Sequence, residues 1–363
     1  MTKRFKTCIL HIGTEKTGTS TIQKFLDSNR KALLKENICY PETPFTRFGS
    51  QWEFVAIAHP YPWTMDAGQA CEIEDDKTLN DFKRNFKESL QKQFSSQPNT
   101  ETLLISSEHF HSRLLSIGTI KELKDFLNPW VEDFKIIIYF RRQDKLAVSY
   151  YTTQIKSGSA TTELYLPSDG PRFRYFDYKW IYRIWREVFE GDELITRLYN
   201  PNPNIGIGAD NSHGVLQEFC NLCNIDFSNK KQPAWLNQSV DAKGLGLIHG
   251  LHKYNNTRKL SLTKTELAMV INQITRMHQG KFFPITRSEA ENFYKQFKEG
   301  NEFVRKKAFP DTGRSLFDTD FSHYPDKRHH LPLVSVEEIQ SLIADMGSIG
   351  SKFNVFKFLK RIK

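Results

Sequence analysis

One stretch near the start of the chain constrains the fold more than any other. An apolar run over residues 8–12 ends at Gly13, and Ile22, Phe25 and Leu26 have the spacing of a buried helix face. Between them lies a loop of small residues, Thr14-Glu15-Lys16-Thr17-Gly18-Thr19-Ser20-Thr21. A strand, such a loop and a helix form a cradle for a phosphate, because the N–H groups of the loop and the positive end of the helix converge on one spot.

The spacing within this loop differs from that of an ATP-binding loop, which requires G-x-x-x-x-G-K-[ST]. Gly13 and Gly18 are five residues apart, as in that motif, but Thr19 stands where the lysine would be. The lysine of this loop is Lys16, two residues before Gly18. A divergent kinase or NTPase that uses ATP or GTP therefore remains an alternative. A measured Mg²⁺-dependent hydrolysis of ATP would favour this alternative.

Strands alternate with helices over the first 200 residues, which predicts a parallel sheet covered on both faces. The expected strands lie at 8–12, 38–40, 102–105, 135–140 and 194–199, and the expected helices at 17–35, 79–94, 120–127, 145–156 and 178–189. Later helices are expected near 213–224, 241–256, 263–278, 288–307 and 336–346. We expect a single domain over residues 1–363, with a nucleotide-binding core at about 5–200 and a helical C-terminal portion at about 210–363.

Polar residues follow two further expected strands at their carboxyl ends, where open parallel sheets bind ligands. Ser107-Glu108-His109 follows one strand, and Arg141 follows another. Ser149 lies eight residues after Arg141, about two turns into the next helix. An arginine and a hydroxyl in this arrangement can both bind one phosphate, distinct from the phosphate in the first loop.

The loop at 13–21 and the segment from Arg141 to Ser149 resemble the nucleotide-binding motifs of the sulfotransferases that use 3′-phosphoadenosine 5′-phosphosulfate (PAPS). Weaker similarities at 33–41, 237–239 and 301–309 resemble bacterial members that act on glycans. The resemblance implies an α/β fold of the P-loop kinase type, with three layers, a central parallel sheet and helices on both faces. It also implies a set of PAPS-binding residues, namely Gly13, Thr14, Lys16, Thr17, Gly18, Thr19, Ser20, Thr21, Arg141 and Ser149.

The expected reaction is sulfuryl transfer to a hydroxyl of a carbohydrate or glycolipid, with 3′,5′-ADP as the product. A transferred sulfuryl group carries less charge than a γ-phosphoryl group, so Lys16 alone can stabilise the leaving oxygen and no metal is required. The acceptor hydroxyl needs a general base, for which Glu108 is the first candidate and His109 and His111 are its rivals. Along an extended chain the Glu108 and His109 side chains would point in opposite directions. Glu108 as a structural ion-pair partner is the alternative.

The amino-acid composition indicates what kind of partner to expect. The chain has 51 Lys and Arg against 42 Asp and Glu, a net charge of +9, which favours an anionic partner. A non-catalytic binder of anionic polymers is thus a second alternative, although no nucleic-acid module is recognisable and none is expected as a partner. The basic segment 352–363 is expected to form a docked helix, with peripheral attachment to an anionic membrane as the alternative.

Five scattered cysteines argue against a disulfide framework, and Cys220 and Cys223 are expected to pack between helices rather than bind a metal. The sequence contains no run with the length of a membrane span or of a signal-peptide core. We therefore expect a soluble cytoplasmic protein, with the inner face of the membrane as a site of peripheral contact. The sequence does not indicate an oligomeric state.

Overall fold

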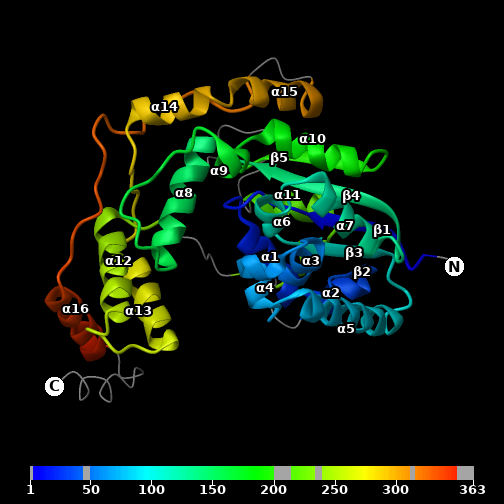
Figure 1. Cartoon of the computed structure of the whole chain (residues 1–363), viewed down its shortest axis with the longest axis horizontal. Coiled ribbons are helices and arrows are strands. Elements are labelled where there is room, and N and C mark those ends of the chain that lie inside the picture. Colours follow the sequence, from blue (N-terminus) through cyan, green and yellow to red (C-terminus); the bar gives the residue numbers. More distant parts are fainter. Residues whose placement is uncertain (1–2, 44–49, 200–213, 234–238, 311–314, 350–363) are drawn as a thin grey trace. The chain divides into compact units, whose positions relative to one another are not determined.

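In the described part of the chain, five parallel strands form one sheet in the order β2-β3-β1-β4-β5 (Figure 1). The computed structural model describes residues 3–43, 50–199, 214–233, 239–310 and 315–349. The strands are β1 (Phe5–His11), β2 (Ile38–Cys39), β3 (Thr102–Ser106), β4 (Val131–Phe140) and β5 (Glu193–Leu198). β1 lies between β3 and β4, so the carboxyl ends of these three strands are adjacent at the centre of the sheet.

Helices occupy most of the remaining described residues. Those before β5 are α1 (Thr19–Ser28), α2 (Arg30–Lys35), α3 (Trp52–Ala58), the 3₁₀ turn η2 (Pro62–Thr64), α4 (Asp66–Ala70), α5 (Asp76–Ser95), α6 (His109–Arg113), α7 (Ile117–Leu127), α8 (Gln143–Lys156), α9 (Gly170–Arg174) and α10 (Tyr178–Val188). Those after β5 are α11 (Gly214–Leu222), α12 (Ala242–Asn256), α13 (Lys264–Met277), α14 (Arg287–Lys295), α15 (Lys298–Ala308) and α16 (Val336–Ile349). None of the described helices has the length and apolar character needed to cross a membrane.

The two faces of the sheet are covered by different helices. Ile137 and Tyr139 of β4 belong to an apolar cluster with residues of α1 and α11, such as Phe25. Side chains alternate along a strand, so Phe134 and Phe140 lie on the opposite face. There Phe140 stacks on Tyr178 of α10 with ring centroids 4.2 Å apart, and Phe134 meets Phe189 just beyond α10 at 5.1 Å. The expected fold class, a parallel sheet with helices on both faces, is confirmed.

Several helix boundaries differ from the sequence prediction. The helix expected over 17–35 breaks at Asn29, whose side chain donates to the Phe25 carbonyl at 2.8 Å and so competes with the helical backbone. The helix expected over 288–307 is divided into α14 and α15. α3 was not expected at all, because Glu53 and the apolar residues after it are all buried and leave no amphipathic pattern.

The cysteine prediction is supported by the same apolar cluster. Cys220 and Cys223 are buried free thiols within it. In the described part of the chain, no group of three His, Cys, Asp or Glu side chains is placed to hold a metal ion. Asn237, Gln238 and the segment 352–363 lie outside the described residues, and the predictions about them stay predictions.

The chain divides into two compact units, which are described separately. The first unit comprises 1–143, 167–236 and 294–319, and the second comprises 144–166, 237–293 and 320–363. In the second unit, α12 packs on α13 and α16, and a Cβ at Gly250 of α12 would lie 2.9 Å from Ile339 of α16. Arg141 belongs to the first unit and Ser149 to the second. The single-domain organisation stays a prediction.

We expect Ile137→Ala to lower the free energy of unfolding by about 2–5 kcal/mol, because it leaves a cavity between β4 and the α1–α11 layer. Chemical denaturation followed by circular dichroism measures the change. Lys6→Ala is the control, since the Lys6 side chain is 68% exposed and its ion pair with Glu101 is on the surface. A loss below about 0.5 kcal/mol for Ile137→Ala would contradict the assigned core.

Candidate anion-binding and acceptor site

The loop between β1 and α1 has backbone conformations that its two glycines permit. Gly13 and Gly18 have φ values of 91° and 84°, in the left-handed region, and Lys16 is there too, at 63°. A Cβ at Gly18 would lie 2.7 Å from Cγ1 of Val215, and one at Gly13 would lie 3.1 Å from Cα of Glu108. The glycines therefore allow both the turn and the close approach of the loop to its neighbours.

Hydrogen bonds fix the loop and leave a row of donors unused. The N–H and hydroxyl of Thr14 both donate to the Tyr139 carbonyl, at 2.8 and 3.0 Å, and the Thr17 hydroxyl donates to the Thr14 carbonyl at 2.6 Å. These hydroxyls shape the loop and are not directed at a ligand. The backbone N–H groups of residues 16–20 have no acceptor among the described residues. They precede and begin α1, whose N-cap is Gly18, so they are arranged as the donors of an anion site would be.

Two cations from the expected site are brought together. Arg141 Nη1, at the carboxyl end of β4, donates to the Lys16 carbonyl at 2.8 Å. The Arg141 guanidinium lies 5.4 Å from the ring centre of Tyr199, and its buried Nε has no hydrogen-bond partner in the described structure. Burial and the neighbouring Arg141 lower the pKa of Lys16, while Glu15 and Glu108 oppose this shift. Ser149 lies on α8, where its carbonyl accepts from Thr152 and Thr153.

The expectation that Glu108 and His109 point in opposite directions is wrong. β3 ends at Ser106, and Glu108 has helical angles (φ −66°, ψ −15°) as the N-cap of α6, so strand alternation does not apply to this pair. Glu108 Oε2 accepts from Gln23 Nε2 at 2.5 Å, and Glu108 Oε1 lies 4.0 Å from His109 Nε2. The His109 ring also lies against Trp52, with ring centroids 3.6 Å apart.

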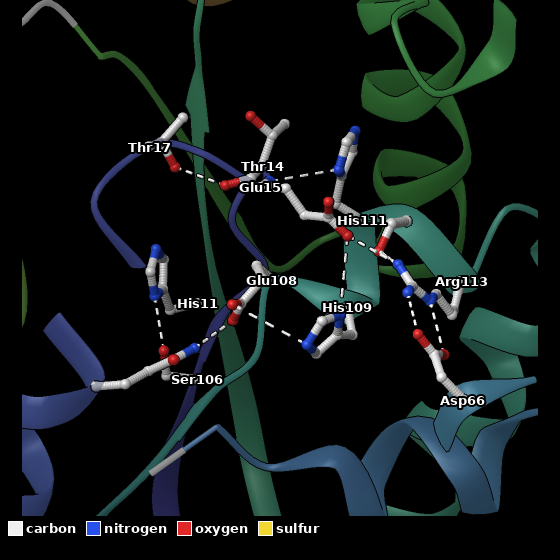
Figure 2. Close-up of polar contacts among 12 residues, drawn as sticks. His11, Thr14, Glu15, Thr17, Asp66, Ser106, Glu108, His109, His111 and Arg113 are labelled. Carbon is white, nitrogen blue, oxygen red and sulfur yellow. Dashed lines mark hydrogen bonds and ion pairs between the residues drawn. The ribbon is translucent and has the colours of Figure 1, made fainter. Parts of the chain in front are cut away.

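Glu15 is a further site residue, which sequence reasoning did not single out. Its Oε1 accepts from Arg113 Nη1 at 2.7 Å and lies 3.7 Å from His109 Nδ1 (Figure 2). Its Oε2 accepts from the Tyr175 hydroxyl at 3.1 Å. Burial by itself would raise the pKa of Glu15, but His109 and Arg113 outweigh it and hold the pKa well below its ordinary value. Arg113 and Tyr175 are distant in sequence, so no local pattern reveals this buried carboxylate.

His111 is fully committed to structural hydrogen bonds. Its Nε2 donates to the Tyr175 carbonyl at 2.9 Å, which leaves Nδ1 to accept the Glu15 N–H at 3.5 Å. Burial lowers the pKa of His111 to about 4, so the ring is neutral at neutral pH. Both nitrogens are occupied, and His111 is therefore not available as the base.

His11 is another residue of this region that the sequence did not single out. It is buried at the end of β1, with Nδ1 2.8 Å from Ser106 Oγ, and burial lowers its pKa to about 3.

The chain is thus an α/β protein with a glycine-bearing loop at the carboxyl end of β1 and a carboxylate–imidazole pair beside it. No protein-family model matches the chain. An uncharacterised protein from Archaeoglobus fulgidus is 24% identical over 247 residues, which are 65% of this chain. The match covers 61% of that relative, so the chain spans about three fifths of its length.

Three solved structures also match, all of them sulfotransferases. A sulfotransferase from Alicyclobacillus acidocaldarius matches with a TM-score of 0.38 and 13% identity over 75% of this chain and 96% of that one. The sulfotransferase domain of the curacin biosynthetic pathway matches with a TM-score of 0.33 and 10% identity, covering 63% of this chain and 77% of that one. The sulfotransferase domain of the olefin synthase from Synechococcus PCC 7002 matches with a TM-score of 0.32 and 13% identity, covering 62% of this chain and 76% of that one.

The buried histidine His111 predicts a pH dependence of stability. Its folded-state pKa of about 4 is below the ordinary value of 6.5, so the unfolded chain binds more protons between these pH values. The free energy of unfolding should therefore fall as the pH falls from 6.5 to 4, by about 3 kcal/mol for this group. Burial raises the pKa of Glu218 to about 7, which acts in the opposite sense.

The test for this pH dependence is a comparison of slopes. Urea denaturation at several pH values should give a shallower decline for His111→Gln than for the wild type. His330→Gln, which alters an exposed residue, should leave the slope unchanged. Equal slopes for the wild type and His111→Gln would contradict the assignment of a buried, neutral His111.

Proposed function

We propose that this protein is a sulfotransferase that moves the sulfuryl group of PAPS to a hydroxyl of a carbohydrate or glycolipid. The observation that carries the proposal is the row of unpaired backbone N–H groups over residues 16–20, with Lys16 within it and Glu108 packed against Gly13 at the same loop. Transfer of a group from an anionic donor to a hydroxyl requires an anion site with a carboxylate base beside it.

The loop suits the 5′ end of PAPS, which supplies the sulfuryl group. The N–H groups of residues 16–20, together with the hydroxyls of Thr19, Ser20 and Thr21 at the start of α1, would bind the 5′-phosphate. Lys16 would stabilise the negative charge that develops on the leaving oxygen. Thr14 and Thr17 would contribute by holding the loop, since their hydroxyls donate to carbonyls of the protein.

Arg141 suits a second phosphate. It has one nitrogen on the Lys16 carbonyl and a buried Nε without a partner in the described structure, so the guanidinium is held beside the loop with a donor to spare. A charge-assisted hydrogen bond of this kind contributes about 1.5–3 kcal/mol. Arg141 would therefore select the 3′-phosphate of PAPS over nucleotides that lack it, and the part expected of Ser149, which belongs to the other unit, stays a prediction.

Glu108 is the proposed general base. Its backbone lies so close to Gly13 that a Cβ there would be 3.1 Å from Glu108 Cα, and Gln23 orients its carboxylate through Oε2. Its other oxygen, Oε1, faces His109 Nε2 at 4.0 Å. An acceptor hydroxyl beside Oε1 would hydrogen-bond to Glu108 through its one proton and pass that proton to Glu108, with the His109 ring next to the pair.

The acceptor side is supported by an open cavity of about 390 Å³ that borders Arg113. His59, Ser112, Ser116 and Thr119 contribute polar groups to its lining. A cavity of this size, lined mostly by apolar surface with a few polar groups, suits one face of a sugar. The acceptor is therefore proposed to lie on the α6–α7 side of the loop.

Calorimetric titration with 3′,5′-ADP and with ADP tests the donor. We expect 3′,5′-ADP to bind more tightly, and Arg141→Ala to weaken it by about 10- to 100-fold relative to ADP, because one charge-assisted bond to the 3′-phosphate is lost. The ratio of the two affinities corrects for any effect on the loop. Arg84→Ala, at an exposed arginine paired with Asp81, is the control.

The other outcomes separate the alternatives. Equal binding of both nucleotides, or a Mg²⁺-dependent preference for ADP, would contradict the sulfotransferase proposal and favour a kinase or NTPase. Binding of neither, with affinity for heparin that falls steeply with salt, would favour the binder of anionic polymers.

Substitution at the base tests the acceptor side of the proposal. With a sugar acceptor and PAPS, Glu108→Gln should lower kcat by about 10²- to 10⁴-fold, because the amide cannot take the proton. The dissociation constant for 3′,5′-ADP should stay within about threefold of the wild type, since Glu108 does not bind the nucleotide. A larger loss of kcat for His109→Gln than for Glu108→Gln would transfer the role of base to His109.

A further inference from the structure

His109 lies between two carboxylates that come from different elements. Its Nδ1 is 3.7 Å from Glu15 Oε1 in the β1–α1 loop, and its Nε2 is 4.0 Å from Glu108 Oε1 at the start of α6 (Figure 2). Trp52 of α3 lies against the ring and limits its rotation. Both contacts are longer than hydrogen bonds, as is common for catalytic groups without a substrate.

Glu15 is a fixed and ionised partner for this ring. Arg113 and Tyr175 donate to its two oxygens, and its own N–H donates to His111. Arg113 in turn donates through Nε to Asp66 of α4, so the guanidinium that holds Glu15 is itself anchored (Figure 2). The carboxylate is therefore held in place on the Nδ1 side of His109.

We propose that Glu15 is a positioning residue, which holds His109 with its Nδ1–H toward the anion-binding loop and its Nε2 toward Glu108. An ionised carboxylate only accepts hydrogen bonds, so it favours a proton on the nitrogen that faces it. Nε2 is then the nitrogen that gains or loses a proton beside the base and the acceptor hydroxyl. One loop residue thus links the anion site to the acceptor site.

The proposed tautomer of His109 rests on Glu15 being the nearer carboxylate, at 3.7 Å from Nδ1 against 4.0 Å between Glu108 and Nε2, whereas the effect on turnover rests on the proposed function. The alternative for Glu15 is a purely structural ion pair with Arg113. In that case the loss of Glu15 would alter stability but leave the tautomer of His109 unchanged. The two ideas therefore differ in a quantity that can be measured without any substrate.

Nitrogen-15 NMR of the histidine rings provides this measurement, with the His109 signal assigned by its absence in His109→Gln. We expect neutral His109 in the wild type to carry its proton on Nδ1, and Glu15→Ala to lose this preference. Glu15→Asp, which keeps a carboxylate, should restore part of it. The matched control is Asp81→Ala, which removes a carboxylate paired with an arginine, Arg84, on the surface.

Activity gives the second readout. Glu15→Ala should lower kcat by about 10- to 100-fold and change the KM for PAPS by less than about threefold, whereas Asp81→Ala should stay within about twofold of the wild type. A proton on Nε2 of neutral wild-type His109 would overturn the proposal, whether or not the variants fold. The expected tautomer in a protein that transfers no sulfuryl group would leave the positioning role standing and reject the proposed function.

Discussion

The site depends on the close approach of the β1–α1 loop to the turn that follows β3. Gly13 makes this approach possible, because a side chain there would meet the Glu108 backbone. Strand order supplies the rest, since β1 pairs with both β3 and β4. Lys16, Glu108 and Arg141, which follow three different strands, are thereby gathered at one edge of the sheet, where ligands bind in open parallel sheets.

Charge is balanced locally within this edge. Lys16 and Arg141 lie close to each other, and their repulsion is offset by Glu15 and Glu108. Glu15 is itself neutralised by Arg113, so the loop keeps its attraction for an anion although it carries a carboxylate. This arrangement separates the roles of the two acidic residues. Glu15 is enclosed by donors, whereas one oxygen of Glu108 faces His109 Nε2 at 4.0 Å.

Much of the fold was predictable because strong local patterns carried it. The buried strand within Val131–Phe140 and the glycine-bearing loop after β1 are such patterns. Short helices were not predictable for the opposite reason. α3 is buried all round, and α6 has five residues, so neither shows a period that sequence reasoning can detect. The helical turn at Glu108 followed from none of the local signals, and the prediction based on strand alternation failed there.

The sequence by itself determined the parallel α/β architecture, the position of the glycine-bearing loop, and Lys16, Glu108 and Arg141 as candidates, because each lies next to a strand end that its neighbours define. Only the tertiary structure decided which groups meet. Glu15 joins Arg113, Tyr175 and His109 through contacts that span large sequence separations, and His111 is committed by the same packing. Such contacts arise from the packing of α6 against the loop, which no local pattern encodes.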